Sequence, residues 1–390
     1  MSGRRREFIM LAVMALCCAA LWMVPGPPPL AHDGARRVRA RVIKVDDAAL
    51  RQHGLLRFGS QLMEVQILSG EHRGERFTAV NEIRAQMELD KYFAPGDCAV
   101  VVMPAADGTA QWRTGKNGRG GHFCRSQSVL VAQDHWRTGW SLFLFALFCL
   151  LLCLFGGWTG AKALFSFVLS CLVIWKMVIP LALRGWPASW TVFAAVCFLT
   201  AAICYLVAGP VRKGTVALLG SGAGVLAGLM MARLFTALMK INGATLPYAQ
   251  ALLYGGYESL NLSDIFVGAM ILASSGAVMD LGMDIAAGVE EVARHNPGLP
   301  RRELLWSGLR IGRSVVGTMT TTLLLAYSGG YITLLMMFCA QGTPVADLLN
   351  NPLVASEAVK TLIGSFSLVL VAPFTAVAAA WLYGRSPGAV

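Results

Sequence analysis

The sequence predicts a polytopic α-helical membrane protein with about eight transmembrane helices and a small extracytoplasmic β-rich domain. Two observations lead to this class. The 390 residues are 56% hydrophobic and only 14% charged, with a mean hydropathy of +0.58, which excludes an ordinary soluble domain. Apolar runs long enough to cross about 30 Å of hydrocarbon recur along the chain, and a single polar region with alternating patterns interrupts them.

The first apolar run follows a positively charged end. The basic segment Arg4–Arg6 precedes the run Phe8–Val24, and a cluster of prolines follows it. Because positive flanks stay in the cytoplasm, residues 1–30 are expected to form an N-terminal signal-anchor helix. Pro29–Ala31 is a poor small-x-small cleavage site, which favours a retained helix over a cleaved one.

Residues 31–138 are expected to fold as the extracytoplasmic β-rich domain. Short alternating runs predict strands, and they lie at Arg39–Ile43, Leu62–Leu68 and Cys98–Met103. A hairpin turn is expected at Ser69–Gly74. The pattern is typical of a compact barrel and leaves an OB-like and an SH3-like type open. Cys98 and Cys124 could pair in an oxidising compartment, and whether they form a disulfide stays open.

Residues 139–390 are expected to form a transmembrane domain of seven helices. The apolar runs lie at 139–157, 161–183, 190–208, 215–239, 265–289, 315–340 and 358–383. If the spans alternate from a cytoplasmic start, Lys and Arg gather in the cytoplasmic connections, as the positive-inside rule requires. Both termini are then cytoplasmic. This distribution explains the net charge of +11, so the expected partner is the lipid bilayer and no nucleic acid.

Asp280 and Asp284 are the most informative charged residues, because they lie in the apolar run Ile265–Val289. A carboxylate within a membrane helix costs about 3 kcal/mol on insertion scales, so it persists where a partner, an ion or water receives it. The four-residue spacing puts both side chains on one helix face. Counted from Ile265, Asp280 lies roughly 22 Å into the membrane, in its inner third.

Hydroxyl side chains are expected near this depth. Two serines precede the aspartates in a patch of small residues that lets a helix or water come close. Threonines of the next span lie at a matching depth, and oxygen ligands of this kind suit a cation or a proton. The candidate binding residues are Asp280, Asp284, Ser274, Ser275, Thr318, Thr320 and Thr321, with Arg310 and Arg313 as candidate counter-ions. The alternative is an inner collar in which the same arginines simply pair with the aspartates.

Three further sequence patterns predict local structure. Gly220, Gly224 and Gly228 recur every four residues, which predicts close helix packing. Pro373 should kink the last span or free a carbonyl. Glu357 and Lys360 are expected to form an interfacial ion pair, because they lie three residues apart.

Catalytic motifs are missing from the sequence. It contains no P-loop, no HExxH and no GxSxG, and no histidine lies inside a span. These absences argue against an ATP-driven pump in one chain, and we expect no enzyme activity and no cofactor. The histidines of the polar region lack ligand spacing, so no metal site is expected.

Several segments from the fifth span onward carry a family resemblance. They are Ser274–Asp280, Met283–Ala286, Asn296–Pro297, Ser307–Gly308, Ile311–Arg313, Gly317–Leu323 and Ala326–Tyr327, with Ser356–Glu357, Gly364–Ser365 and Pro373–Ala376 in the last helix. They resemble the YibE/F-like family of bacterial multi-pass membrane proteins. Thr321, where the family pattern has an asparagine, and Ser314, where it has an acid, are departures. The resemblance implies an inner-membrane protein with an outer domain and a transport role, and it supplies no substrate.

Two main functional hypotheses follow. The first is a secondary transporter or permease for an unknown small solute or cation, in which the aspartate pair binds a cation or proton. The alternative is a membrane-anchored assembly or signalling scaffold whose outer β domain recruits an extracytoplasmic protein partner. A membrane-embedded enzyme that uses the aspartates as acid and base comes third, and both acids on one helix argue against it. A homo-oligomer also stays open.

Overall fold

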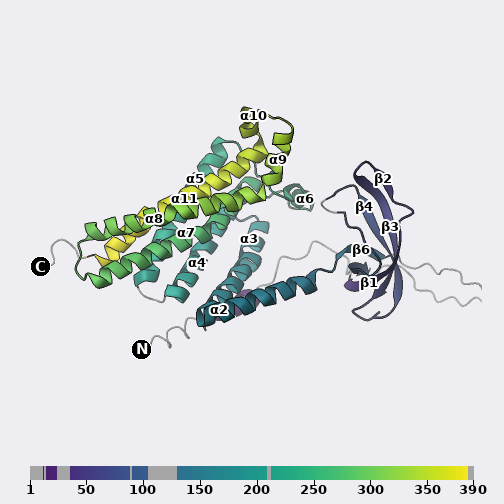
Figure 1. The fold of residues 1–390 in the computed structure, drawn as a ribbon, viewed down its shortest axis with the longest axis horizontal. Helices are drawn as coiled ribbons and strands as arrows, with labels where there is room; N and C mark the ends of the chain where they lie inside the picture. Colours follow the sequence, from purple (N-terminus) through teal and green to yellow (C-terminus); the bar gives the residue numbers. More distant parts are fainter. Residues whose placement is uncertain are drawn as a thin grey trace, which may run out of the picture. The chain divides into compact units, whose positions relative to one another are not determined.

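The computed structural model describes residues 12, 15–23, 36–87, 90–103, 130–208 and 212–384. The chain divides into two compact units. Residues 28–151 form the barrel unit, and residues 152–390 together with residues 1–27 form the helical unit. Figure 1 shows the strands of the first and the long helices of the second. The predicted combination of a β-rich domain with long apolar helices is therefore confirmed.

The described part of the barrel unit contains six strands. They are β1 (Arg36–Asp46), β2 (Arg51–His53), β3 (Leu56–Ile67), β4 (Arg76–Arg84), β5 (Cys98–Met103) and β6 (Leu130–His135). The sheet order is β1-β5-β6-β4-β3-β2, and a further pairing of β1 with β3 closes five strands into a barrel. The pairing of β4 with β6 is parallel, whereas β1 pairs with β3 and β5 in the antiparallel sense.

The barrel interior follows the two-residue period of its strands. In β3, Met63, Val65 and Ile67 are buried while the residues between them are more exposed, because successive side chains point to opposite faces of a sheet. The turn expected at Ser69–Gly74 joins β3 to β4, as predicted. Whether Cys98 and Cys124 form a disulfide stays open, because Cys124 lies outside the described residues.

After the barrel strands, the described chain is mostly helical. They are α2 (Thr138–Val173), the π-helical turn η1 (Ile174–Val178), α3 (Ile179–Leu183), α4 (Ala188–Ala208), α5 (Arg212–Leu238), α6 (Ala249–Tyr254), α7 (Leu262–His295), α8 (Arg301–Gly330), α9 (Ile332–Ala340), α10 (Val345–Asn350) and α11 (Pro352–Tyr383). By length and apolar composition, five helical stretches of the described chain could cross a membrane, or six if α8 and α9 form one span. The expected number of eight stays a prediction.

The longest stretch is divided by a glycine. From α2 to α3 it runs over 46 residues, which is more than twice the length that one crossing needs. Gly157 interrupts α2 with a non-helical backbone, φ 52° and ψ −127°. This break lies where the sequence predicts the end of one apolar run and the start of the next. A side chain at Gly160 would collide with the carbonyl oxygen of Leu152, so the chain passes close to itself beside the break.

The apolar run 315–340 forms two helices where the sequence predicts one. α8 ends at Gly330 and α9 begins at Ile332, with a bend of 63° between them. Two consecutive glycines, Gly329 and Gly330, are poor helix formers, and Tyr331 has a non-helical backbone. Hydropathy does not reveal this bend, because the apolar character continues across it.

Five helices, α4, α5, α7, α8 and α11, pack against one another in the core of the helical unit, where α11 contacts α5, α7 and α8 (Figure 1). The predicted close packing of the glycines is confirmed. Each of the three α5 glycines contacts one α11 residue; the pairs are Gly220 with Thr375, Gly224 with Val371, and Gly228 with Ser367. About a quarter turn further round, α11 meets two glycines of α8, Gly308 and Gly312. α11 remains one helix with Pro373 inside it.

The α5–α11 contact predicts a sharp difference between two neighbouring glycines. A Cβ at Gly220 would lie 2.6 Å from the Cα of Thr375, which is backbone and cannot rotate away, whereas a Cβ at Gly222 would meet no atom within 4 Å. We expect Gly220→Ala to destabilise the protein by about 1–3 kcal/mol through overpacking. Gly222→Ala should leave stability unchanged or raise it slightly, since alanine favours a helix. Thermal unfolding of both variants in detergent checks this, and equal midpoints would contradict the packing.

Candidate functional site

α7 carries Asp280 and Asp284 on an exposed side. Ala269, Ala273 and Gly276 continue the same row at spacings of three or four residues, and all five are exposed. We call this row the aspartate face. Residues on the opposite side of α7, such as Val278 and Gly282, contact Ser221 of α5. Both carboxylates therefore point away from the core of the helical unit. Neither one has an ion-pair or side-chain hydrogen-bond partner among the described residues.

Two close contacts fix the register between α7 and α8. A Cβ at Gly288 would lie 2.8 Å from Ile311, and a Cβ at Gly312 would lie 3.3 Å from Ile285. The two helices run antiparallel and are joined by a short turn. Decreasing residue numbers along α7 therefore match increasing residue numbers along α8. At 1.5 Å per residue, this register brings residue 318 level with residue 280, and residue 314 level with residue 284.

The register brings one of the predicted threonines beside the aspartates. Thr318 follows Ile311 by seven residues, or two turns, so it lies on the side of α8 that faces α7, and it is exposed. Ser314, which the sequence analysis treated only as a departure, lies one turn earlier and is exposed too. The Thr318 hydroxyl donates to the carbonyl of Val315 at 2.9 Å. Its lone pairs remain available to an ion or water.

Thr321 lies further round α8, next to Thr318 on the exposed surface. Its hydroxyl donates to the carbonyl of Gly317 at 3.0 Å. Arg310 is exposed, one residue from Ile311. The exposed surface of α8 thus presents a row of polar side chains and one glycine, which we call the α8 row: Arg310, Ser314, Gly317, Thr318 and Thr321.

Two other predicted residues lie on different sides of α8. Arg313 is two residues, or roughly 200°, from Ile311, so its side chain points away from α7. Thr320 shares a face with Tyr327, which contacts Gly364 of α11. The hydroxyls of Thr320 and Tyr327 are buried and have no hydrogen-bond partner within the described part of the chain. The structure therefore does not bring Arg313 or Thr320 to the aspartates of the same chain.

The two predicted serines also separate. Ser274 is buried against Gly364 of α11, and its hydroxyl donates to the carbonyl of Met270 at 3.1 Å. Ser275 is half-buried and lines a cavity of about 290 Å³ between α4, α7 and the η1 end of α2. Ala273 and Gly276 line the same cavity, so it borders the aspartate face.

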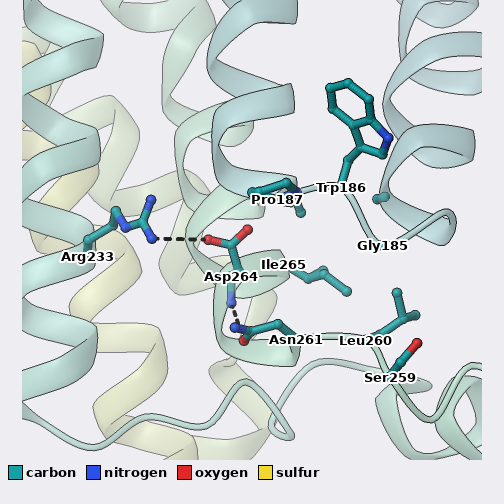
Figure 2. Close-up of a pocket in the computed structure, with 11 residues that line it drawn as sticks. Gly185, Trp186, Pro187, Arg233, Ser259, Leu260, Asn261, Asp264 and Ile265 are labelled. Carbon is teal, nitrogen blue, oxygen red and sulfur yellow. Dashed lines mark hydrogen bonds and ion pairs between the residues drawn. The ribbon is translucent and has the colours of Figure 1, made fainter.

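A second charged cluster lies at the other end of α7 (Figure 2). The Asp264 carboxylate accepts hydrogen bonds from the backbone N–H of Ser189, at 3.0 Å, and from its hydroxyl, at 2.6 Å. The guanidinium of Arg233 lies 3.9 Å from the same carboxylate. Ser189 is in the first turn of α4, so Asp264 supplies an N-terminal cap to a helix other than its own.

This cluster borders a cavity of about 250 Å³ whose lining includes Trp186, Arg233 and Asn261. Sequence reasoning did not single out Asp264, whose side chain is only 12% exposed. It missed Arg233 altogether, which lies within the apolar run 215–239. A lone basic residue inside an apolar run was the available signal, because such a charge needs a partner.

The expected pair of Glu357 and Lys360 forms, with 2.6 Å between Nζ and Oε1. It is more buried than a surface pair, since the two side chains are 25% and 16% exposed. The Lys360 ammonium also lies 5.4 Å from the ring centroid of Phe266 in α7. No three His, Cys, Asp or Glu side chains of the described chain gather into a metal site.

Residues 144–385 match the family model described as YibE/F-like protein. The chain belongs to this family. The match includes the aspartate face, the α8 row and the Asp264 cluster, and it confirms the resemblance drawn from the sequence. Membership of the YibE/F-like family, together with the apolar helices, identifies a membrane protein. No curated protein and no solved structure matches the chain.

The Asp264 cluster predicts a loss of stability in this YibE/F-like protein when the carboxylate is removed. Asp264→Ala should lower the free energy of unfolding by about 1–3 kcal/mol, because Ser189 loses two hydrogen bonds and Arg233 loses its charge partner. Glu258→Ala is the matched control, since Glu258 is an exposed acid in the preceding loop. Thermal unfolding in detergent measures both. A midpoint for Asp264→Ala that equals the control would refute a capping role.

Proposed function

We propose that this YibE/F-like protein is a permease of the bacterial inner membrane that moves a small cation or protons, and that Asp280 and Asp284 bind the ion. The observation that carries the proposal is the juxtaposition on α7 and α8. Two carboxylates and the hydroxyls of Ser314 and Thr318 lie at matching levels on one side of α7 and α8.

The energetics of the membrane support this proposal. Each carboxylate costs about 3 kcal/mol at the centre of a membrane helix on insertion scales, so a pair without an ion-pair partner among the described residues needs a compensating role. Carboxylate and hydroxyl oxygens are ligands for hard cations, and a carboxylate also carries a proton. Thr321 adds a hydroxyl beside Thr318, and Arg310 is the candidate counter-ion.

The proposed topology has eight spans with both termini inside and the barrel unit outside. The break at Gly157 divides the 46-residue stretch into two spans, and α8 with α9 counts as one bent span. The first helix, with α4, α5, α7 and α11, supplies the others. In this topology Asp280 and Asp284 lie in the inner half of the membrane, whereas the Asp264 cluster and the Glu357–Lys360 pair lie towards the outside.

Neutralisation of Asp280 tests the permease. Asp280→Asn removes the charge and keeps the shape, so we expect cation or proton flux to fall at least tenfold while the protein still inserts and folds. Asp347→Asn, in the exposed α10, should keep normal flux. The measurement uses purified protein in liposomes with a pH-sensitive dye inside and a series of monovalent and divalent cations outside. Full flux in Asp280→Asn would rule out the assigned ion site.

A second candidate function, a scaffold whose barrel recruits a protein partner, is favoured by an apolar patch on the barrel unit. Leu55 and Met87 are 89% and 75% exposed, and with Leu56 and Tyr92 they line a cavity of about 320 Å³. Exposed apolar patches often mark protein interaction sites. The strand order and the parallel β4–β6 pair favour an OB-like barrel over an SH3-like one, and OB barrels are common binding modules.

Deletion of residues 36–136 separates the two functions. A permease should retain measurable flux in liposomes, because its ion site lies in α7 and α8. A scaffold should lose all cellular activity, measured as failure of the shortened chain to restore the phenotype of a strain that lacks the gene. The double change Leu55→Ser and Met87→Ser is the milder variant and should give the same loss if the patch binds the partner. Full restoration by both variants would eliminate the scaffold.

A further inference from the structure

The aspartate face is a polar surface that nothing in the described chain covers. Asp280 and Asp284 are exposed and unpaired, although α7 is one of the helices long and apolar enough to cross a membrane. In a bilayer this surface would meet lipid, and charged side chains in spans almost always face a protein interior or water. The α8 row lies beside the aspartate face and would also meet lipid, although it carries an arginine and three hydroxyls.

The described part of the first helix does not fill this position. Within its described part, Cys18 and Leu21 pack against the core of the helical unit, and Trp22 lies against Lys176 of η1, with 5.8 Å from the ammonium to the ring centroid. The first helix therefore lies along the stretch that contains η1.

We propose that a second copy of the chain covers the aspartate face, and that Arg310 of each copy is the counter-ion for Asp284 of the other. The inference rests on the proposed function in treating the aspartates as the ion site. It adds that the site is complete only between two copies. The partner is thus this chain itself, bound through α7 and α8.

The charge of Arg310 and its position along the helix axis both support the second copy. Arg310 is exposed beside the α7 contact and forms no ion pair among the described residues. In the α7–α8 register it lies one turn, about 6 Å, from the level of Asp284, which an arginine side chain spans. A two-fold axis along the membrane normal preserves levels, so α7 of one copy meets α8 of the other with opposite charges facing. Such an interface is self-complementary.

The glycines of these two helices support the same arrangement. Gly220 and Gly228 in α5 are in tight contact with α11, but Gly276 in the aspartate face and Gly317 in the α8 row have no atom within 4 Å of the position of a Cβ. Small residues let transmembrane helices approach closely. Ala269, Ala273 and Gly276 form such a strip over two turns of α7. Ala273 and Gly276 border the cavity beside α4, and packing among the described residues leaves this strip exposed, whereas packing between two copies would bury it.

Disulfide cross-linking between differently tagged copies tests the proposal. All ten native cysteines are replaced, one copy carries Gly276→Cys, and the other carries Thr321→Cys, which lies at the same level on α8. Copper phenanthroline is added to native membranes. We expect a product that bears both tags, at least tenfold more abundant than with Leu362→Cys in place of Thr321→Cys. Leu362 is an exposed residue at a similar level on α11. Yields equal to this control would overturn the proposal.

A charge exchange identifies the counter-ion. Arg310→Asp alone and Asp284→Arg alone place like charges together in the interface, so each should reduce the cross-linked product several-fold. The double variant should recover it. Failure to recover, with normal insertion of the double variant, would refute Arg310 as the counter-ion.

The cross-linking and flux experiments together test the paired copies and the permease function separately. Cross-linking with undiminished flux in Asp280→Asn would support the paired copies and reject the permease. Loss of flux in Asp280→Asn with cross-linking at the control level would retain the permease and reject the second copy.

Discussion

The helical unit depends on the close approach of α5 and α11. Gly220, Gly224 and Gly228 remove side chains from one strip of α5, so that Thr375, Val371 and Ser367 of α11 lie directly against its backbone. In lipid the hydrophobic effect does not hold helices together, and close packing of this kind takes its place. Because α11 also contacts α7 and α8, its position on α5 sets where both of these helices lie. The contact between α5 and α11 therefore determines the relative positions of the aspartate face and the α8 row.

The polar groups of the helical unit fall into two kinds. Asp264, Ser189 and Arg233 satisfy one another between α4, α5 and α7, and Glu357 pairs with Lys360 on α11. These groups are paired within the chain, as expected for polar side chains that stabilise a membrane fold. Asp280, Asp284 and Arg310 have no such partners among the described residues. This contrast is the reason for assigning function to the second kind and a structural role to the first.

The sequence was sufficient for features that depend on local pattern. Apolar runs predicted the long helices, alternation predicted the strands around Val65, and the four-residue spacing of Gly220, Gly224 and Gly228 predicted a close contact. It was insufficient where distant segments meet. No local pattern indicates that Arg233 and Asp264 face each other. The direction of Asp280 was also hidden, because a helix that is apolar on every side does not reveal which side faces the core. The bend at Tyr331 is hidden by continuous hydropathy.

The cap that Asp264 provides to α4 has a consequence for synthesis. Ser189 and Asp264 are separated by 75 residues, and the chain emerges from its amino end at about 5–20 residues per second. For several seconds after α4 has been made, its first turn has no carboxylate partner, and Arg233 is made before its counter-charge. The contacts of Asp264 with Ser189 and Arg233 therefore form only after the first turn of α7 has been synthesised. Until then, α4 and α5 are incompletely packed, and the insertion machinery or lipid headgroups must accommodate the unpaired charge of Arg233.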